Sequence, residues 1–170
     1  MVEGLVIRIE SPADIPGVRA VNEAAFETGA EAALVDALRE GAKFVLSLVA
    51  DLDGEIVGHV LFTDIVIEPG GAEARMLGLA PMSVRPDWQG RGIGSALVRS
   101  GIEDCAALGY RGIVVLGHPG FYPRFGFVPA SRHGITCIYD APDEAFMALA
   151  LGEAPLPGGR ALYQPEFAAL

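Results

Sequence analysis

At 170 residues, 51% of them hydrophobic, the chain is long enough and apolar enough to fold around a core of its own. A formal net charge of −10 at pH 7 argues against a nucleic-acid partner, because proteins that bind nucleic acid present positive charge to its phosphates. Acidic surfaces attract cations, which favours an amine as substrate, although the same charge also serves solubility alone.

The first elements expected are a short strand and two helices. Leu5, Ile7 and Ile9 alternate with other side chains, which predicts a strand with one buried face. The first helix has two candidate caps, Ser11 and Asp14. The two helices are expected over residues 11–26 and 31–40.

Three strands joined by short turns are expected next. Asp53-Gly54 is a strong hairpin signal between the first two, and Pro69-Gly70-Gly71 turns the chain into the third. The expected strands are residues 44–50, residues 55–67 and a strand that ends at Val84.

A helix over about 92–108 then follows a glycine-rich segment. The side chains expected on its buried face are Ile93, Leu97, Ile102, Cys105 and Leu108. After it, "RGIVVLG" (111–117) reads as a strand buried on both faces, and "FYPRFGF" (121–127) as a short helical turn leading into another strand. The tail holds a candidate last strand near 146–151 and a Pro/Gly break at 155–159. This order predicts a mixed sheet covered by helices.

The glycine-rich segment, "QGRGIG" at 89–94, precedes a helix and favours a phosphate site. Unpaired N–H groups at a helix start attract anions, and glycines let the backbone come close to phosphate oxygens. A diphosphate could then bind the amides from about Gln89 to Ser95; the alternative is a tight turn that packs helix on sheet. A Walker loop is excluded because no lysine follows the glycines, and the dinucleotide fingerprint fails on context.

Three segments in order resemble the GNAT acyltransferases, which bind acyl-coenzyme A. "QGRGIG" matches the family's [RQ]-x-x-G-x-[GA] loop. Upstream, "LAPMSVRP" (79–86) is similar to the strand before that loop, and downstream "FYPRFGF" is similar to the family's "fY-x-x-x-GF" segment. The resemblance covers Leu77–Phe127, and "VLGHPGFYPRFGFVPA" looks closest to small bacterial predicted acetyltransferases. It implies an α/β fold of the GNAT type: a mixed, mostly antiparallel sheet flanked by helices, with a strand pair that splays after Pro81.

The resemblance also implies an acetyl-CoA-dependent N-acetyltransferase that acts by direct attack of a primary amine in a ternary complex. The cofactor's pantetheine arm would pair with Met82, Ser83 and Val84. Its phosphates would meet the loop residues Gln89, Gly90, Arg91, Gly92, Ile93, Gly94 and Ser95. Pro81 gives an independent reason for an interrupted sheet, since it cannot donate to a ladder; an ordinary strand end is the alternative.

Catalytic roles carried over from the family fall on few residues. The N–H of Val84 would bind the thioester oxygen, and Tyr122 would protonate the leaving thiolate. Tyr122 is otherwise a packing residue among neighbouring phenylalanines. His118 is a candidate base, because an imidazole can accept a proton near neutral pH, or it is a structural histidine. The weaker candidates for the base are Glu73, Asp64 and Glu27, and a water chain can replace a fixed base.

The remaining charged and aromatic side chains leave several interpretations open. Arg91 and Arg124 either reach the cofactor's phosphates or lie in solvent, and Trp88 packs beneath the loop or, less favourably, stacks on adenine. No metal is expected, because the histidines and cysteines lack ligand spacing. Rival interpretations are a non-catalytic acyl-CoA-binding module on the same fold and a nucleotide-binding protein.

The location and partners complete these expectations. No apolar run is long enough to span a bilayer, and the first residues lack the layout of a secretory signal. Cys105 and Cys137 have no CxxC spacing, and Cys105 is expected to be a buried, reduced thiol. We therefore expect one domain over residues 1–170, a cytoplasmic location, a small-molecule or peptide amine as acceptor, no membrane partner, and a homodimer as a further option.

Overall fold

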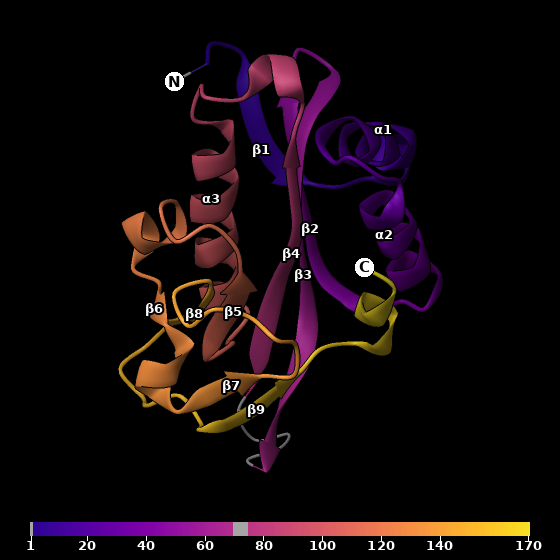
Figure 1. Cartoon of the computed structure of the whole chain (residues 1–170). Coiled ribbons are helices and arrows are strands. Elements are labelled where there is room, and N and C mark those ends of the chain that lie inside the picture. Colours follow the sequence, from indigo (N-terminus) through magenta and orange to yellow (C-terminus); the bar gives the residue numbers. More distant parts are fainter. Residues whose placement is uncertain (1, 70–74) are drawn as a thin grey trace. The chain divides into compact units, whose positions relative to one another are not determined.

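The computed structural model describes residues 2–69 and 75–170 (Figure 1). These residues form two compact units. Unit 1 comprises the chain up to Phe62, Pro81–Gly101 and Pro165–Leu170, and unit 2 comprises Thr63–Ala80 and Ile102–Gln164. Three elements contribute residues to both units: β3 (Glu55–Pro69), β4 (Met76–Val84) and α3 (Ile93–Ala107). Glu73, a weak candidate for the base, lies outside the described residues.

Unit 1 begins with the strand and helices that the sequence predicts. These elements are β1 (Leu5–Ile9), α1 (Ile15–Ala25), α2 (Ala30–Glu40) and β2 (Phe44–Leu52). β1 pairs antiparallel with β2, from Leu5 opposite Leu52 to Ile9 opposite Leu48. The expected buried face of β1 stops early: Leu5 and Ile7 are half-buried, but Ile9, the last strand residue, is 65% exposed.

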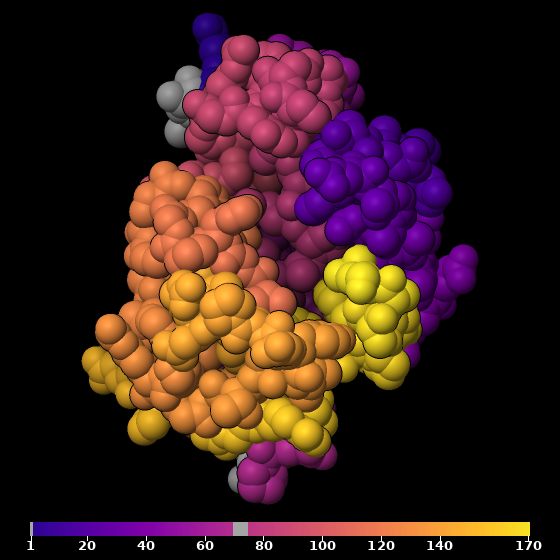
Figure 2. All heavy atoms as spheres, viewed as in Figure 1, coloured from indigo at the N-terminus to yellow at the C-terminus, as the bar shows by residue number. Residues whose placement is uncertain are grey.

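Helices cover both faces of the strands in unit 1, with α1 and α2 on one side and the first half of α3 on the other (Figure 1). On one face of β3, His59 is hydrogen-bonded to Asn22 of α1. On the other face, Gly58 lies against Ile93 and Leu97 of α3. The C-terminal 3-10 helix (Pro165–Ala169) also belongs to unit 1, where Glu166 pairs with Lys43; its yellow atoms adjoin the indigo helices in Figure 2.

The buried face of α3 is confirmed in part. Ile93, Leu97 and Cys105 are 0–1% exposed, and Ile102 is half-buried. Leu108 is 47% exposed, because α3 ends at Ala107 and Leu108 falls in the following turn.

Unit 2 contains the mixed part of the sheet. β5 (Gly112–Leu116) runs parallel to the start of β4 and antiparallel to β8 (Phe146–Ala150), which also pairs with β6 (Val128–Pro129). As expected for a strand covered on both faces, β5 is buried from Gly112 to Val115, although its last residue, Leu116, is 44% exposed. The mixed, mostly antiparallel sheet with flanking helices confirms the fold class.

Two strands of unit 2 were not predicted. β7 (Ile135–Cys137) and β9 (Gly159–Leu162) pair in parallel, and β9 also pairs antiparallel with the end of β3. The sequence interpretation treated 155–159 as a break. Strands of three and four residues are too short to show the alternation that identifies a strand.

The parallel ladder between β4 and β5 ends at Gly78 and Val114, earlier than the expected opening after Pro81. The backbone groups of the residues just before and just after β4 point to opposite sides of the strand. The C=O of Arg75 accepts from Arg111 on the β5 side, whereas the N–H of Arg85 donates to Val57 on the β3 side. Residues an even number apart in a regular strand point their N–H and C=O to the same side, so β4 must hold an extra residue, as in a β-bulge. Pro81 lies within this interval and within the strand, so it is not an ordinary strand end.

Candidate active site

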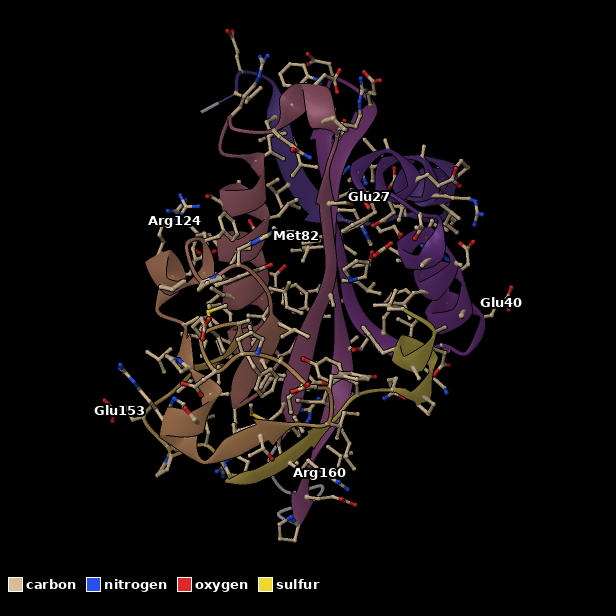
Figure 3. The ribbon with its side chains drawn as sticks, in the orientation of Figure 1. Glu27, Glu40, Met82, Arg124, Glu153 and Arg160 are labelled. Carbon is tan, nitrogen blue, oxygen red and sulfur yellow. The ribbon has the colours of Figure 1, made fainter. Side chains whose placement is uncertain are left out.

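The end of β4 presents backbone groups that β3 does not use. The N–H of Arg85 donates to Val57 of β3 at 2.9 Å. Burial alternates regularly from Leu79 to Val84, as in a strand without an extra residue, so the N–H groups of Val84 and Met82 point away from β3. Both side chains are half-buried, and Met82 is labelled on β4 in Figure 3. Ser83 between them is 3% exposed, and its hydroxyl has no hydrogen-bond partner among the described residues.

A single 3-10 turn (Pro86–Trp88) joins β4 to the glycine loop. Trp88 donates its N–H to Arg85 at 2.8 Å, and the N–H of Gln89 donates to Pro86 at 3.4 Å. The side-chain amide of Gln89 donates to the carbonyl of Val84 at 2.9 Å. Gln89 therefore ties the loop to the strand end, and a role of its own in cofactor binding stays a prediction.

The glycines of this loop have unusual backbone angles and open surroundings. Gly90 and Gly92 have φ values of +74° and +86°, which L side chains rarely adopt, and a Cβ on either would meet nothing within 4 Å. Ile93, 1% exposed, anchors the first turn of α3 in the core. The first intrahelical acceptor is Gly92, which receives the N–H of Ala96 at 3.0 Å. A helix supplies no partner for the N–H groups of its first turn, here residues 93–95, so they are available to an anion.

Arg91 is the cation of this loop. Its guanidinium lies 4.7 Å from the centre of the Trp88 ring, and the side chain is exposed. Trp88 is half-buried and packs with the loop, as one of its two interpretations expected. Nearby Arg85 differs, because Glu55 and Asp87 neutralise it. The loop thus combines free amides with an arginine that is not neutralised.

Tyr122 lies in unit 2, in the 3-10 turn Tyr122–Phe125. It is 6% exposed, and its ring packs edge-on against Phe121 at 5.0 Å and Phe127 at 5.6 Å. Burial raises the pKa of Tyr122 to about 12, so the hydroxyl stays protonated at neutral pH, although it is a weaker acid than an exposed phenol. The packing interpretation is confirmed, and the catalytic one stays a prediction.

His118 supports the same turn through its backbone. Its carbonyl accepts the N–H groups of Phe121 at 3.1 Å and Tyr122 at 3.4 Å, while the residue itself is exposed. The other carboxylate candidates lie elsewhere. Asp64 accepts a hydrogen bond from the Tyr110 hydroxyl at 2.9 Å, and Glu27 is exposed beyond the end of α1 (Figure 3).

Arg124 is the cation of the Tyr122 turn. Its guanidinium lies 4.6 Å from the centre of the Phe121 ring, and its Nε donates to the Phe121 carbonyl at 3.2 Å. The side chain points outward (Figure 3). Among residues 2–69 and 75–170, no carboxylate pairs with Arg91 or Arg124. Basic residues that do have such partners include Arg8, Arg19, Arg39, Lys43, Arg85 and Arg160.

One buried polar network escaped the sequence interpretation. His59 is fully buried, with Nδ1 3.1 Å from the Asn22 amide and Nε2 2.9 Å from the Ser47 hydroxyl. Burial lowers its pKa to about 3, so His59 is neutral. Its partners are 37 and 12 residues away, and no sequence pattern joins them.

The structure also bears on metal binding and on the two cysteines. Within the described parts of the chain, no three His, Cys, Asp or Glu side chains gather where they could hold a metal ion. Cys105 is a buried free thiol, as expected, and burial raises its pKa to about 12. Cys137 is a partly buried free thiol. None of the helices in the described residues has the length and apolar character to span a bilayer.

Comparison with known proteins bears on this geometry. A family model for a GNAT acetyltransferase domain matches residues 43–129. The Escherichia coli "Uncharacterized N-acetyltransferase YhbS" is 36% identical over 155 residues, which cover 91% of this chain and 92% of that protein. A second E. coli protein, "Uncharacterized N-acetyltransferase YjhQ", is 38% identical over 84% of this chain and 81% of its own length.

Two solved structures are similar over nearly the whole chain. The E. coli GNAT family N-acetyltransferase YhbS in complex with CoA has a TM-score of 0.92 and 34% identity, covering 99% of this chain and 94% of that one. A GNAT family acetyltransferase from Brucella melitensis in complex with acetyl-CoA has a TM-score of 0.81 and 37% identity, covering 96% and 97%. The glycine loop, the strand before it and the tyrosine turn thus occur in a chain that belongs to the GNAT family of acetyltransferases.

Proposed function

We propose that the protein binds acetyl-CoA and transfers its acetyl group to a primary amine by direct attack in a ternary complex. The observation that carries this proposal is the glycine loop: two glycines with open space around them lead into a helix start whose amides have no helical partner. The CoA and acetyl-CoA held by the two similar GNAT structures support the choice of donor.

The donor would contact residues of the loop and of β4. Its diphosphate would accept hydrogen bonds from the amides of residues 93–95, with Arg91 supplying positive charge. The pantetheine arm would pair with the N–H groups of Met82 and Val84, which point away from β3. Ser83 lies between them in the same strand, and its buried hydroxyl is a further candidate contact.

The reaction needs an oxyanion donor, an acid and a route for the amine's proton. The neutral amine nitrogen attacks the thioester carbonyl carbon, and the N–H of Val84 stabilises the oxyanion that forms. Collapse of the tetrahedral intermediate breaks the C–S bond, and the Tyr122 hydroxyl gives its proton to the leaving thiolate. The ammonium nitrogen of the intermediate loses its proton through His118 or a chain of water molecules, and a proton from the solvent restores the Tyr122 hydroxyl. The products are an N-acetyl amine and CoA.

The first experiment is calorimetric titration with acetyl-CoA, with NAD and ATP as controls, followed by thiol release with a panel of amines. Stoichiometric binding of acetyl-CoA alone, with amine-dependent release of CoA, would support the proposal. Binding without release for any amine would favour the non-catalytic acyl-CoA module. Binding of NAD or ATP in place of acetyl-CoA would overturn it.

Replacing the acid tests the mechanism separately. We expect Tyr122→Phe to lower kcat by about 10²–10⁴-fold, the usual contribution of a positioned acid, and to change the acetyl-CoA affinity little. Tyr110→Phe is the matched control, because it removes a phenol that donates to Asp64. If Tyr122→Phe and Tyr110→Phe turn over equally fast, Tyr122 is a packing residue only.

The proposal also covers the acceptor, the domain organisation, the location and the oligomeric state. The acceptor is a small-molecule or peptide amine, and the whole chain serves as one functional domain. The cytoplasmic location expected from the sequence agrees with two cysteines that are free thiols. A homodimer stays a prediction, which light scattering of the purified protein would test.

A further inference from the structure

Unit 1 contains a surface cavity of about 570 Å³ that includes none of the residues assigned to the donor. It lies between α1 and the turn from β2 to β3. The residues that line it are Ala13, Asp14, Gly17, Ala20, Val21, Ala24, Gly54, Glu55, Ile56 and Arg85.

Small side chains on one face of the first helical segment make this space. Ala13, Gly17, Ala20 and Ala24 follow one another at helical spacing and leave room where larger residues would fill it. At Gly17 the helix approaches β3 closely, because a Cβ there would lie 2.8 Å from Cγ1 of Ile56. The cavity therefore has a floor fixed by close packing and walls that are short aliphatic groups.

The charged groups at the cavity are mostly acidic. Arg8 bridges Asp14, at 2.6 Å, and Asp51, at 3.1 Å. Arg85 bridges Glu55 and Asp87. Of these residues Asp14, Glu55 and Arg85 line the cavity. The two ion-pair clusters to which they belong contain four carboxylates and two guanidiniums, a net charge of −2. Arg8 holds the pKa of the Asp14 carboxyl well below its usual range, so that carboxylate stays ionised at neutral pH.

The cavity and the donor loop are formed with different helices, α1 and α3. His59 faces α1 through its contact with Asn22, whereas the adjacent Gly58 faces Ile93 at the start of α3. The cavity is lined by α1, and the glycine loop leads into α3. A molecule in the cavity therefore does not compete for the loop amides.

We propose that this cavity is a second ligand site, separate from the donor loop, which binds a small organic cation with amine groups and a short aliphatic body. The volume of about 570 Å³ lies within the range of ligand pockets, about 300–1,000 Å³. The excess of two negative charges favours a diamine over a monoamine, and the alanine walls accept its methylene groups. This inference goes beyond the acetyl transfer proposed above and does not depend on it.

Titration calorimetry with 1,4-diaminobutane tests this site. The neutral 1,4-butanediol and the anionic succinate are probes of similar length. We expect one molecule of the diamine to bind, neither control to bind, and the affinity to be unchanged when CoA, which has no acetyl group to transfer, is present at saturation. Absence of diamine binding, or preferential binding of succinate, would overturn the proposal.

Two variants and a control locate the binding. Ala20→Leu fills the cavity from an exposed helical position that tolerates leucine, and we expect it to weaken diamine binding by about tenfold or more. Glu55→Gln removes one charge and should weaken binding about twofold to fivefold, the range for an exposed ion pair. Glu40→Gln makes the same change on α2, where the side chain points away from the fold (Figure 3), and should have no effect. Equal diamine affinity in wild type and Ala20→Leu would place the binding elsewhere and refute this site.

Discussion

Glycine serves two different purposes in the two functional regions of this protein. In the loop of unit 1, Gly90 and Gly92 have positive φ and a Cβ on either would enter open space. In unit 2, Gly112 and Gly117 are packed. A Cβ on Gly112 would lie 2.8 Å from the Leu149 carbonyl oxygen, and one on Gly117 would lie 2.5 Å from Cε2 of Tyr122.

This difference separates a surface kept free for a ligand from a surface closed by packing. A glycine in open space with strained φ gives the backbone a shape and leaves room beside it. A glycine under an aromatic ring lets that ring settle in one place. The first kind lies where we propose that the donor binds, and the second packs against the proposed acid.

Gly117→Ala should have the largest effect, because it disrupts the packing of the Tyr122 ring. The new Cβ must displace the Tyr122 ring, and displacement of a catalytic group by about 1 Å can cost about 10²-fold in rate. We expect kcat to fall by about a hundredfold, and overpacking to reduce the free energy of unfolding by about 1–3 kcal/mol. Steady-state thiol release and urea unfolding measure the two effects.

Gly120→Ala is the control for that substitution. Gly120 lies in the same segment before Tyr122, and a Cβ there would meet nothing within 4 Å. Its kcat should stay near that of wild type. If Gly120→Ala and Gly117→Ala lose activity equally, the segment is sensitive to any change, and the contact with Tyr122 is not the cause.

Gly92→Ala should weaken donor binding at the glycine loop, an effect of intermediate size. The Cβ intrudes on the space beside the first amides of α3, and the loss of one hydrogen bond to a charged group is worth about 1.5–3 kcal/mol. We therefore expect acetyl-CoA to bind about tenfold more weakly or worse, by calorimetry. The strain of a side chain at φ +86° should also cost about 1–2 kcal/mol of stability.

Gly54→Ala separates strain from ligand contact. Gly54 has φ +92° and open space around it, but it lies in the turn from β2 to β3. It should lose about as much stability as Gly92→Ala and keep full donor affinity. A loss of donor affinity in both variants would mean that strain, transmitted through unit 1, weakens binding.

The loop and the tyrosine turn were predictable because each is encoded by neighbouring residues. "QGRGIG" and "FYPRFGF" each contain their own turn residues and lie beside strong strand or helix patterns. The expected boundaries of α1, α2 and α3 agree with the structure within a few residues for the same reason, although helix α3 ends before Leu108.

Features made by distant residues could not be predicted. The His59 network joins α1, β2 and β3, and the cavity combines residues from before α1 with Arg85 after β4. Sequence patterns also do not distinguish the open Gly92 from the packed Gly117, since both stand between a strand and a helical turn. Only the surroundings of each Cβ separate them.

Arg124→Gln tests whether the region around Tyr122 also binds the donor, and it has the smallest expected effect. Each region has an arginine held over an aromatic ring without a carboxylate partner in the described residues: Arg91 over Trp88 in unit 1, and Arg124 over Phe121 in unit 2. If Arg124 meets a phosphate of the donor, its loss should weaken CoA binding about twofold to fivefold, as for an exposed ion pair. The loss should also be smaller at high salt, because salt screens exposed charges.

Arg132→Gln serves as the control. Arg132 is an exposed arginine in the next 3-10 turn, so the substitution removes the same charge from unit 2. A matched loss in both variants would mean that only the net charge of the protein affects the donor, whereas a loss in Arg124→Gln alone would give the packed region a share in donor binding.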